Sequence, residues 1–215
     1  MKNDLTELVF ILDKSGSMSG LEKDTIGGFN SLIEKQKNEK GEAIVSTVLF
    51  NDEMDVIYDR VNIQEVPKLT DKEYFVCGCT ALLDAIGNSI NHIIHVHNNL
   101  KDEECPSKTL FIITTDGMEN SSHEYNYKKI KELIDLSKEK NGFEYIFLGA
   151  NIDSEEEASK LGIDKDQAVT YKCDEVGVGL NNEALDCAIA GFRSERKLSK
   201  KWRESIDKDV KKRGK

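Results

Sequence analysis

The sequence predicts an α/β protein with a doubly wound, mostly parallel sheet, one antiparallel edge strand and helices on both faces. Short apolar runs alternate with stretches of helical periodicity in the order β-α-β-β-α-β-α-β-α-β-α. Several runs are apolar at every position, which is typical of strands covered on both faces. Only residues 51–53 separate the second apolar run from the third, so these two runs are expected to pair as a hairpin at a sheet edge.

The first half of the chain contains three predicted strands and two predicted helices. A helix at 20–39 has apolar residues at helical spacing, and Gly41 is a plausible stop for it. The helix at 80–98 carries Leu82, Leu83, Ile86 and Ile90 on one side. The strands are expected at 8–12, 43–50 and 54–61.

The second half continues the alternation of strands and helices. A helix at 127–140 is expected to end at Asn141-Gly142. Ser154 is a candidate cap for a short helix, supported by Glu157 three residues later. Strands are predicted at 109–114, 143–148 and 168–171, with a last helix at 181–193. We therefore predict a single domain over 1–195 and a basic C-terminal extension over 196–215, helical or disordered.

Composition indicates a soluble protein with a highly charged surface. Of the 215 residues, 38% are hydrophobic and 33% charged. No apolar run approaches the roughly 20 residues of a membrane helix, and the N-terminus lacks the pattern of a signal peptide. Five cysteines, an odd number in a chain of this length, indicate free thiols. Together these features predict a cytoplasmic protein that does not insert into membranes.

The net charge of −10 is unevenly distributed. Residues 193–215 hold eleven Lys/Arg and four Asp/Glu, while the rest of the chain is acidic. A basic tail could contact nucleic acid, anionic lipid or the acidic body itself. Because acidic residues interrupt the basic run, we expect a solvated, partly helical tail, and this tail is the only indication of nucleic-acid binding. The sequence leaves open whether Trp202 packs on the body or anchors a partner.

Three predicted strand or helix ends carry oxygen-bearing side chains. DKSGS after the first strand contains Asp13, Ser15 and Ser17, the helix at 80 begins with Thr80, and TTDGMEN after the strand at 109 contains Asp116. In parallel sheets, sites form in loops at the carboxyl ends of strands near the switch point. Two carboxylates and three hydroxyls are hard ligands that suit Mg²⁺ or Mn²⁺ and leave room for waters and an outside ligand.

Each piece has a simpler interpretation when taken alone. Ser17 or Ser19 could cap the following helix, Thr80 could cap its own helix, and Asp116-Gly117 could be an ordinary turn. Together, on loops that the topology brings to one edge, the three pieces favour a metal site.

This combination resembles the metal-ion-dependent adhesion site of the von Willebrand factor A domain family over residues 5–195. Within the family the chain is most similar to compact, stand-alone intracellular members of bacterial or phage type. The resemblance implies Asp13, Ser15, Ser17, Thr80 and Asp116 as metal ligands, direct or through water. It also implies Mg²⁺, with Mn²⁺ or Ca²⁺ as alternatives, and a protein partner that donates an Asp or Glu to the metal.

Some residues around these motifs differ from the family pattern or are compatible with more than one role. Cys79 stands where many relatives have glycine. Glu119 is expected to support the site, and His123 either lines its rim or is an ordinary loop histidine. His92 and His95 lie one turn apart, but no carboxylate spacing supports a metal site there, so we expect a surface pair.

Three functions follow from these observations. The first is a cytosolic, non-enzymatic module that binds protein partners through the metal. The second is a metal-dependent hydrolase or phosphotransferase with Asp13 as nucleophile. Against the second, position 15 is serine where an aspartyl-phosphate enzyme has a second aspartate, and no Walker-type loop appears. The third is a scaffold that binds partners without metal.

Overall fold

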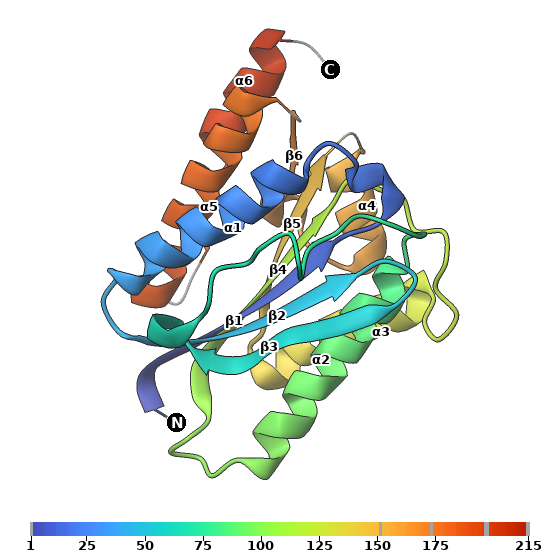
Figure 1. Cartoon of the computed structure of the whole chain (residues 1–215). Coiled ribbons are helices and arrows are strands. Elements are labelled where there is room, and N and C mark those ends of the chain that lie inside the picture. Colours follow the sequence, from blue (N-terminus) through green and yellow to red (C-terminus); the bar gives the residue numbers. More distant parts are fainter. Residues whose placement is uncertain (1, 151, 173, 196–197, 214–215) are drawn as a thin grey trace.

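A six-stranded sheet forms the centre of the chain (Figure 1). The computed structural model describes residues 2–150, 152–172, 174–195 and 198–213. The strands lie in the order β3-β2-β1-β4-β5-β6, and every neighbouring pair is parallel except β2 and β3. They are β1 (Lys2–Asp13), β2 (Glu42–Phe50), β3 (Met54–Asn62), β4 (Pro106–Thr115), β5 (Glu144–Ala150) and β6 (Ala168–Tyr171). The predicted fold class is confirmed, including the antiparallel edge strand.

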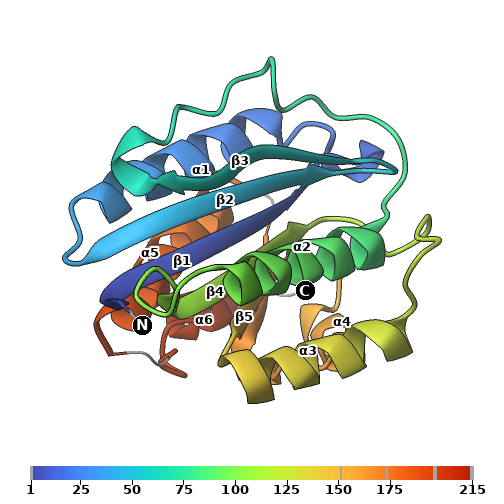
Figure 2. The ribbon, with the colours of Figure 1, turned by 90° about the horizontal axis from the view of Figure 1, so that it is seen from below.

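Six α-helices cover the two faces of this sheet. Figure 2 shows α1 and α5 on one side of the sheet and α2 and α3 on the other. The helices are α1 (Glu22–Lys37), α2 (Leu82–Asn99), α3 (Tyr127–Asn141), α4 (Ser154–Leu161), α5 (Glu175–Glu195) and α6 (Glu204–Arg213). Short 3₁₀ turns lie at Gly16–Met18, Ile63–Glu65 and Lys165–Gln167.

Side chains of the central strands pack into two separate hydrophobic cores, one on each face of the sheet. On β1, Leu8, Phe10 and Leu12 pack with α1 and α5, whereas Val9 and Ile11 pack with α2 and α3. Successive side chains of a strand point to opposite faces, so a continuously apolar strand supplies both cores. This explains why the sequence of β1 shows no alternation of apolar and polar residues.

Helix α2 is attached to the sheet near its C-terminal end. The His97 ring nitrogen lies 2.6 Å from the Glu7 carboxylate of β1, and Glu7 is fully buried. Arg60 forms an ion pair with the same carboxylate. Because buried carboxylates are stable only when paired, this cluster holds the helix in place. At its opposite end, α2 begins at Leu82, two residues after Thr80, so the position of the helix matters for the candidate site.

Two helix starts differ from the prediction. Ser154 does not cap α4: the cap is Asp153, whose carboxylate accepts the N–H of Glu156 at 3.1 Å. The Ser154 side chain is buried, and its hydroxyl lies 2.9 Å from the hydroxyl of Thr170 on β6. Helix α5 begins at Glu175 rather than 181, with the carboxylate of Asp174 accepting the N–H of Gly177 at 2.8 Å.

The basic C-terminal residues pack on the acidic body. Trp202 is only 7% exposed, and its indole N–H donates to the carbonyl of Asp166 at 3.1 Å. Ile206 of α6 lies in the core that also contains α1 and α5. Residues 196–197, where the predicted extension begins, lie outside the described residues, as does Cys173. No helix in the described part of the chain is long and apolar enough to span a membrane.

Candidate metal centre

The candidate site lies at the carboxyl edge of β1 and β4, where the chain order of the strands reverses. β1 and β4 are parallel neighbours, and Leu12 pairs with Thr114 in their register. β1 therefore ends at Asp13 beside the end of β4 at Thr115. The loop after β1, the segment before α2 and the loop after β4 meet at this edge (Figure 1), as expected for a switch point of a doubly wound sheet.

Asp13 is the buried anchor of the site, with a side chain 0% exposed. One carboxylate oxygen accepts the N–H of Ser15 at 2.7 Å, and the other accepts the hydroxyl of Thr115 at 2.6 Å. The backbone N–H of Asp116 also bonds this carboxylate. Burial raises the pKa of Asp13 above its usual value, and these hydrogen bonds oppose the rise only in part. A cation beside Asp13 would lower the cost of its buried charge.

Three hydroxyls from two loops converge next to Asp13. The Ser15 and Ser17 hydroxyl oxygens lie 3.0 Å apart, and the Thr80 hydroxyl donates to that of Ser15 at 2.9 Å. Ser15 and Thr80 are buried, whereas Ser17 is exposed. The cluster therefore joins the buried Asp13 to the surface.

The loop after β4 closes against the same hydroxyls. A Cβ atom at Gly117 would lie 2.8 Å from the Ser17 hydroxyl oxygen and 2.8 Å from that of Thr80. Real Cβ atoms essentially never approach so closely, so only glycine fits here without a shift. Asp116, which is half-buried, precedes this glycine. The structure thus brings all five predicted ligand residues to one place.

None of these hydroxyls caps a helix. The residue before α1 is Leu21 and the residue before α2 is Ala81, and neither helix has a side-chain cap. Ser15 precedes the 3₁₀ turn but its side chain forms no capping bond. The capping alternative for Ser17, Ser19 and Thr80 is therefore wrong, and the hydroxyls of Ser15, Ser17 and Thr80 are directed at one another instead.

The position of Thr80 is set by the loop after β4. The Thr80 N–H donates to the Asn120 side chain at 2.9 Å, and the Asn120 N–H donates to the Thr80 carbonyl at 3.1 Å. Glu119 accepts the N–H of Leu83 in the first turn of α2 at 3.0 Å. Glu119 thus supports the site as expected, by tying the Asp116 loop to the helix that follows Thr80.

A second set of contacts holds the loop that contains Ser15 and Ser17. The Gly16 N–H donates to the Gly78 carbonyl at 3.0 Å, and the Cys77 N–H donates to the Lys14 carbonyl at 2.9 Å. The Tyr74 hydroxyl donates to the carbonyl of Asp13, so its buried ring fixes the end of β1. Gly78 has φ +76°, and a Cβ there would overlap the Asp52 carboxylate. Sequence reasoning missed Tyr74 and Gly78, because nothing local to them indicates these partners.

Thr115 was also missed as a functional residue, although it stands inside the TTDGMEN motif. Its hydroxyl donates to Asp13 and accepts the N–H of Gly117 at 3.1 Å. Position alone could have indicated it, since Thr114 pairs with Leu12 and Thr115 follows at the end of β4. Thr115 thereby connects the two Asp-bearing loops.

The donor set fits a hard divalent cation. In the described residues, no group of three or more His, Cys, Asp and Glu could hold a metal. The Asp13 cluster is not such a group, because three of its five proposed ligands are serine or threonine hydroxyls. Hydroxyl oxygens suit hard ions such as Mg²⁺ and not soft metals. His92 and His95 do not form a site: His92 lies 3.0 Å from Asp59, and His95 lies beside Asn99. His123 is exposed, and its backbone N–H donates to Asp84.

Comparison with known proteins finds similarity in structure alone. No protein-family model matches the chain, and no curated protein matches it in sequence. A von Willebrand factor type A structure from Catenulispora acidiphila matches with a TM-score of 0.61 and 16% identity, covering 88% of this chain and 43% of that one. Proximal thread matrix protein 1 from the mussel byssus, with a zinc-occupied MIDAS motif, matches with a TM-score of 0.61 and 15% identity, covering 87% and 46%.

A third match is the manganese-loaded TRAP protein of Plasmodium vivax. It has a TM-score of 0.56 and 16% identity, covering 82% of this chain and 72% of that one. The chain spans less than half the length of the Catenulispora and mussel proteins. At these identities the matches establish the fold, and the zinc and manganese belong to those proteins.

Proposed function

We propose that this chain, which has the fold of von Willebrand factor A domains, is a metal-dependent module that binds a protein partner. One observation carries the proposal: the hydroxyls of Ser15, Ser17 and Thr80 converge beside the buried carboxylate of Asp13 without capping any helix. Structures with this fold that hold zinc or manganese support a divalent cation in general.

The proposed ligands are Asp13, Ser15, Ser17, Thr80 and Asp116, and the proposed ion is Mg²⁺, with Mn²⁺ or Ca²⁺ as alternatives. When bound, the cation would offer a coordination position to an Asp or Glu carboxylate of the partner. The chain's own residues shape that position. Thr115 and the Ser15 N–H orient Asp13, and Gly117 leaves the space beside Ser17 and Thr80 free of a side chain.

The geometry favours binding over catalysis. Hydrogen bonds from Ser15 and Thr115 orient the Asp13 carboxylate, and position 15 is a serine where an aspartyl-phosphate enzyme has a second aspartate. Among the hydrogen bonds of the described residues, none connects a histidine or lysine to the Ser15, Ser17 or Thr80 hydroxyls. A nucleophile–base pair of the kind used in covalent catalysis is therefore missing from this part of the chain.

Thermal unfolding with and without metal tests the proposal. At a free Mg²⁺ concentration 100-fold above Kd, binding stabilises the folded state by about 2.7 kcal/mol, which raises Tm by roughly 5–10 °C in a chain of this size. The Asp13→Ala variant should show no such response, whereas Ser194→Ala, at an exposed serine of α5, should respond like the wild type. An equal Mg²⁺ response in wild type and Asp13→Ala would exclude the metal site.

Two further measurements separate the alternatives. A partner captured equally with Mg²⁺ and with EDTA, by wild type and by Asp116→Ala, would favour a metal-independent scaffold. Phosphate release that requires Mg²⁺ and is lost in Asp13→Asn would favour an enzyme. We also propose a cytoplasmic location, since Cys77 and Cys79 are free and exposed thiols, which persist in reducing compartments.

A further inference from the structure

We propose that the surface around this site selects one kind of partner segment: an Asp or Glu flanked by a large apolar side chain and by basic residues. The inference rests on the proposed function, in which the carboxylate of the partner reaches the metal. The inference specifies which residues flank that carboxylate in the partner. It is drawn from the apolar and charged side chains at the rim of the site.

Two exposed apolar side chains lie at this rim. Met118 is 66% exposed and directly follows Gly117, which abuts the Ser17 and Thr80 hydroxyls. Phe75 is 54% exposed and directly follows Tyr74, which bonds the Asp13 carbonyl. They come from the loop after β4 and from the segment before α2, so they approach the site from two loops. Large apolar side chains left exposed beside a polar site indicate an interaction surface.

The charge of the rim is strongly negative. The segments that surround the site, 13–24, 51–55, 71–81 and 116–126, contain eleven acidic residues and three lysines. One of these lysines, Lys14, is buried in an ion pair with Asp55 at 2.6 Å. A divalent cation balances only the charge of Asp13 and Asp116. The remaining field repels an acidic partner, so a partner that supplies a carboxylate needs basic residues around it.

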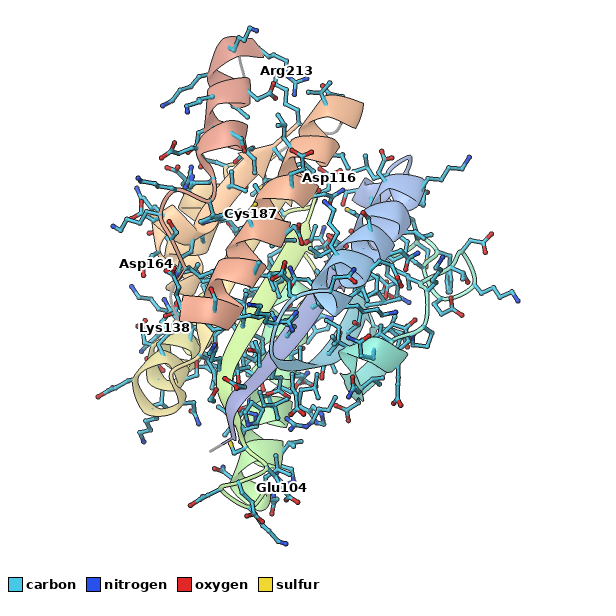
Figure 3. All side chains as sticks on the ribbon, turned by 90° about the vertical axis from the view of Figure 1, so that its left-hand side faces the viewer. Glu104, Asp116, Lys138, Asp164, Cys187 and Arg213 are labelled. Carbon is cyan, nitrogen blue, oxygen red and sulfur yellow. The ribbon has the colours of Figure 1, made fainter. Side chains whose placement is uncertain are left out.

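Asp52 and Glu53 bring this charge close to the ligands. Asp52 accepts the N–H of Cys79 at 3.1 Å, and Cys79 precedes Thr80 in the chain. Both acidic residues are exposed, and within the described residues neither forms an ion pair with lysine or arginine. They are therefore available to basic side chains of a partner. Glu104 lies at the opposite end of the molecule from Asp116 (Figure 3). It and the preceding residue in the chain, Glu103, are both exposed and offer a matched control.

Synthetic peptides test the inference directly. Fluorescein-labelled GKKLDLKKG is titrated with the full chain in Mg²⁺ and followed by anisotropy, beside the versions GKKLNLKKG, GEELDLEEG and GKKSDSKKG. We expect GKKLDLKKG to bind at least about tenfold more tightly than GEELDLEEG at low salt, with the difference shrinking as salt rises. The serine version should bind several-fold more weakly than the leucine version.

Surface variants test which rim residues cause the preference for apolar flanks and which cause the preference for basic flanks. Met118→Ser should weaken binding of the leucine peptide and leave the serine peptide unchanged, whereas Leu136→Ser on α3, an exposed leucine elsewhere, should change neither. The double variant Asp52→Asn/Glu53→Gln should reduce the preference for lysine flanks several-fold. The double variant Glu103→Gln/Glu104→Gln should leave that preference as in wild type.

The outcomes separate this inference from the proposed function. If GKKLDLKKG and GKKLNLKKG bind equally, and EDTA has no effect, the metal–carboxylate function itself is wrong. If the Asp peptide requires Mg²⁺ but binds equally with lysine or glutamate flanks and with leucine or serine, the function stands and this inference is overturned. Mg²⁺-dependent self-association of the chain in sedimentation, without peptide binding, would make a second copy the occupant and would also overturn it.

Discussion

Replacing Asp13 by asparagine should reverse the stability order of mutant and wild type according to whether metal is present. The carboxylate is fully buried, and burial raises its pKa, so the charged form is costly in the metal-free protein. Each unit of such a rise corresponds to about 1.4 kcal/mol at pH values above the raised pKa. Asparagine has the same shape, lacks the charge, and keeps an acceptor for the N–H of Ser15.

In EDTA at neutral pH we therefore expect Asp13→Asn to be more stable than wild type, because the variant buries no charge. In saturating Mg²⁺ the wild type gains about 2.7 kcal/mol at 100-fold excess over Kd, and the variant gains none, so the order reverses. Chemical denaturation in urea measures both values, with Asp59→Asn on exposed β3 as a control that should change stability by less than about 0.5 kcal/mol.

The pH dependence has a defined sign. A carboxyl whose folded-state pKa lies above its unfolded value stabilises the protein below the unfolded pKa, and this contribution is lost as pH rises through the folded pKa. The stability advantage of Asp13→Asn in EDTA should thus grow from acidic to neutral pH. A variant that is less stable than wild type in EDTA at every pH would refute the reasoning, because Asp13 would then be a structural acceptor and not a charge held for a cation.

Three further predictions concern the site and the C-terminal helix. Gly117→Ala should abolish the Mg²⁺ response because its Cβ would meet two ligand hydroxyls, whereas Gly179→Ala in α5, with nothing within 4 Å, should retain the response and gain about 0.5–1 kcal/mol. Thr115→Val should lose about 1–3 kcal/mol in urea unfolding and weaken Mg²⁺ binding, since its hydroxyl bonds Asp13; unchanged Mg²⁺ affinity would contradict its orienting role. Trp202→Ala should cost about 3–5 kcal/mol in one cooperative transition, and a cost under about 1 kcal/mol would show that the α6 region is not part of the core.

Several features of the fold could be read from local patterns. The continuously apolar runs of β1, β4 and β5 predicted strands buried on both faces, and the short 51–53 connection predicted the β2–β3 hairpin. Asn141-Gly142 ends α3 as expected, with Gly142 in the left-handed region at φ +67°. Such features depend on the order of a few neighbouring residues, and therefore sequence is sufficient for them.

Other features depended on contacts between distant residues. Ser154 fits the local capping pattern, but its hydroxyl forms a hydrogen bond with the hydroxyl of Thr170 on β6. Asp153 caps α4 instead. The last helix was predicted from 181, yet α5 begins at Glu175, where the Asp174 carboxylate accepts the N–H of Gly177. Burial against the body likewise orders Trp202 in a segment whose composition predicts a solvated tail.

By itself, the sequence determined which residues carry the proposed oxygen ligands and which strand ends they follow. Asp13, Ser15 and Ser17 fall on one loop, and Thr80 and Asp116 lie far downstream. Only the tertiary structure decided between capping and convergence, because a hydroxyl next to a helix start can satisfy either role. Which role such a hydroxyl takes depends on groups from other parts of the chain, here Thr115, Gly117 and Tyr74. Hydrogen bonds act over about 3 Å, so residues a hundred positions apart interact only after the sheet has aligned the ends of β1 and β4.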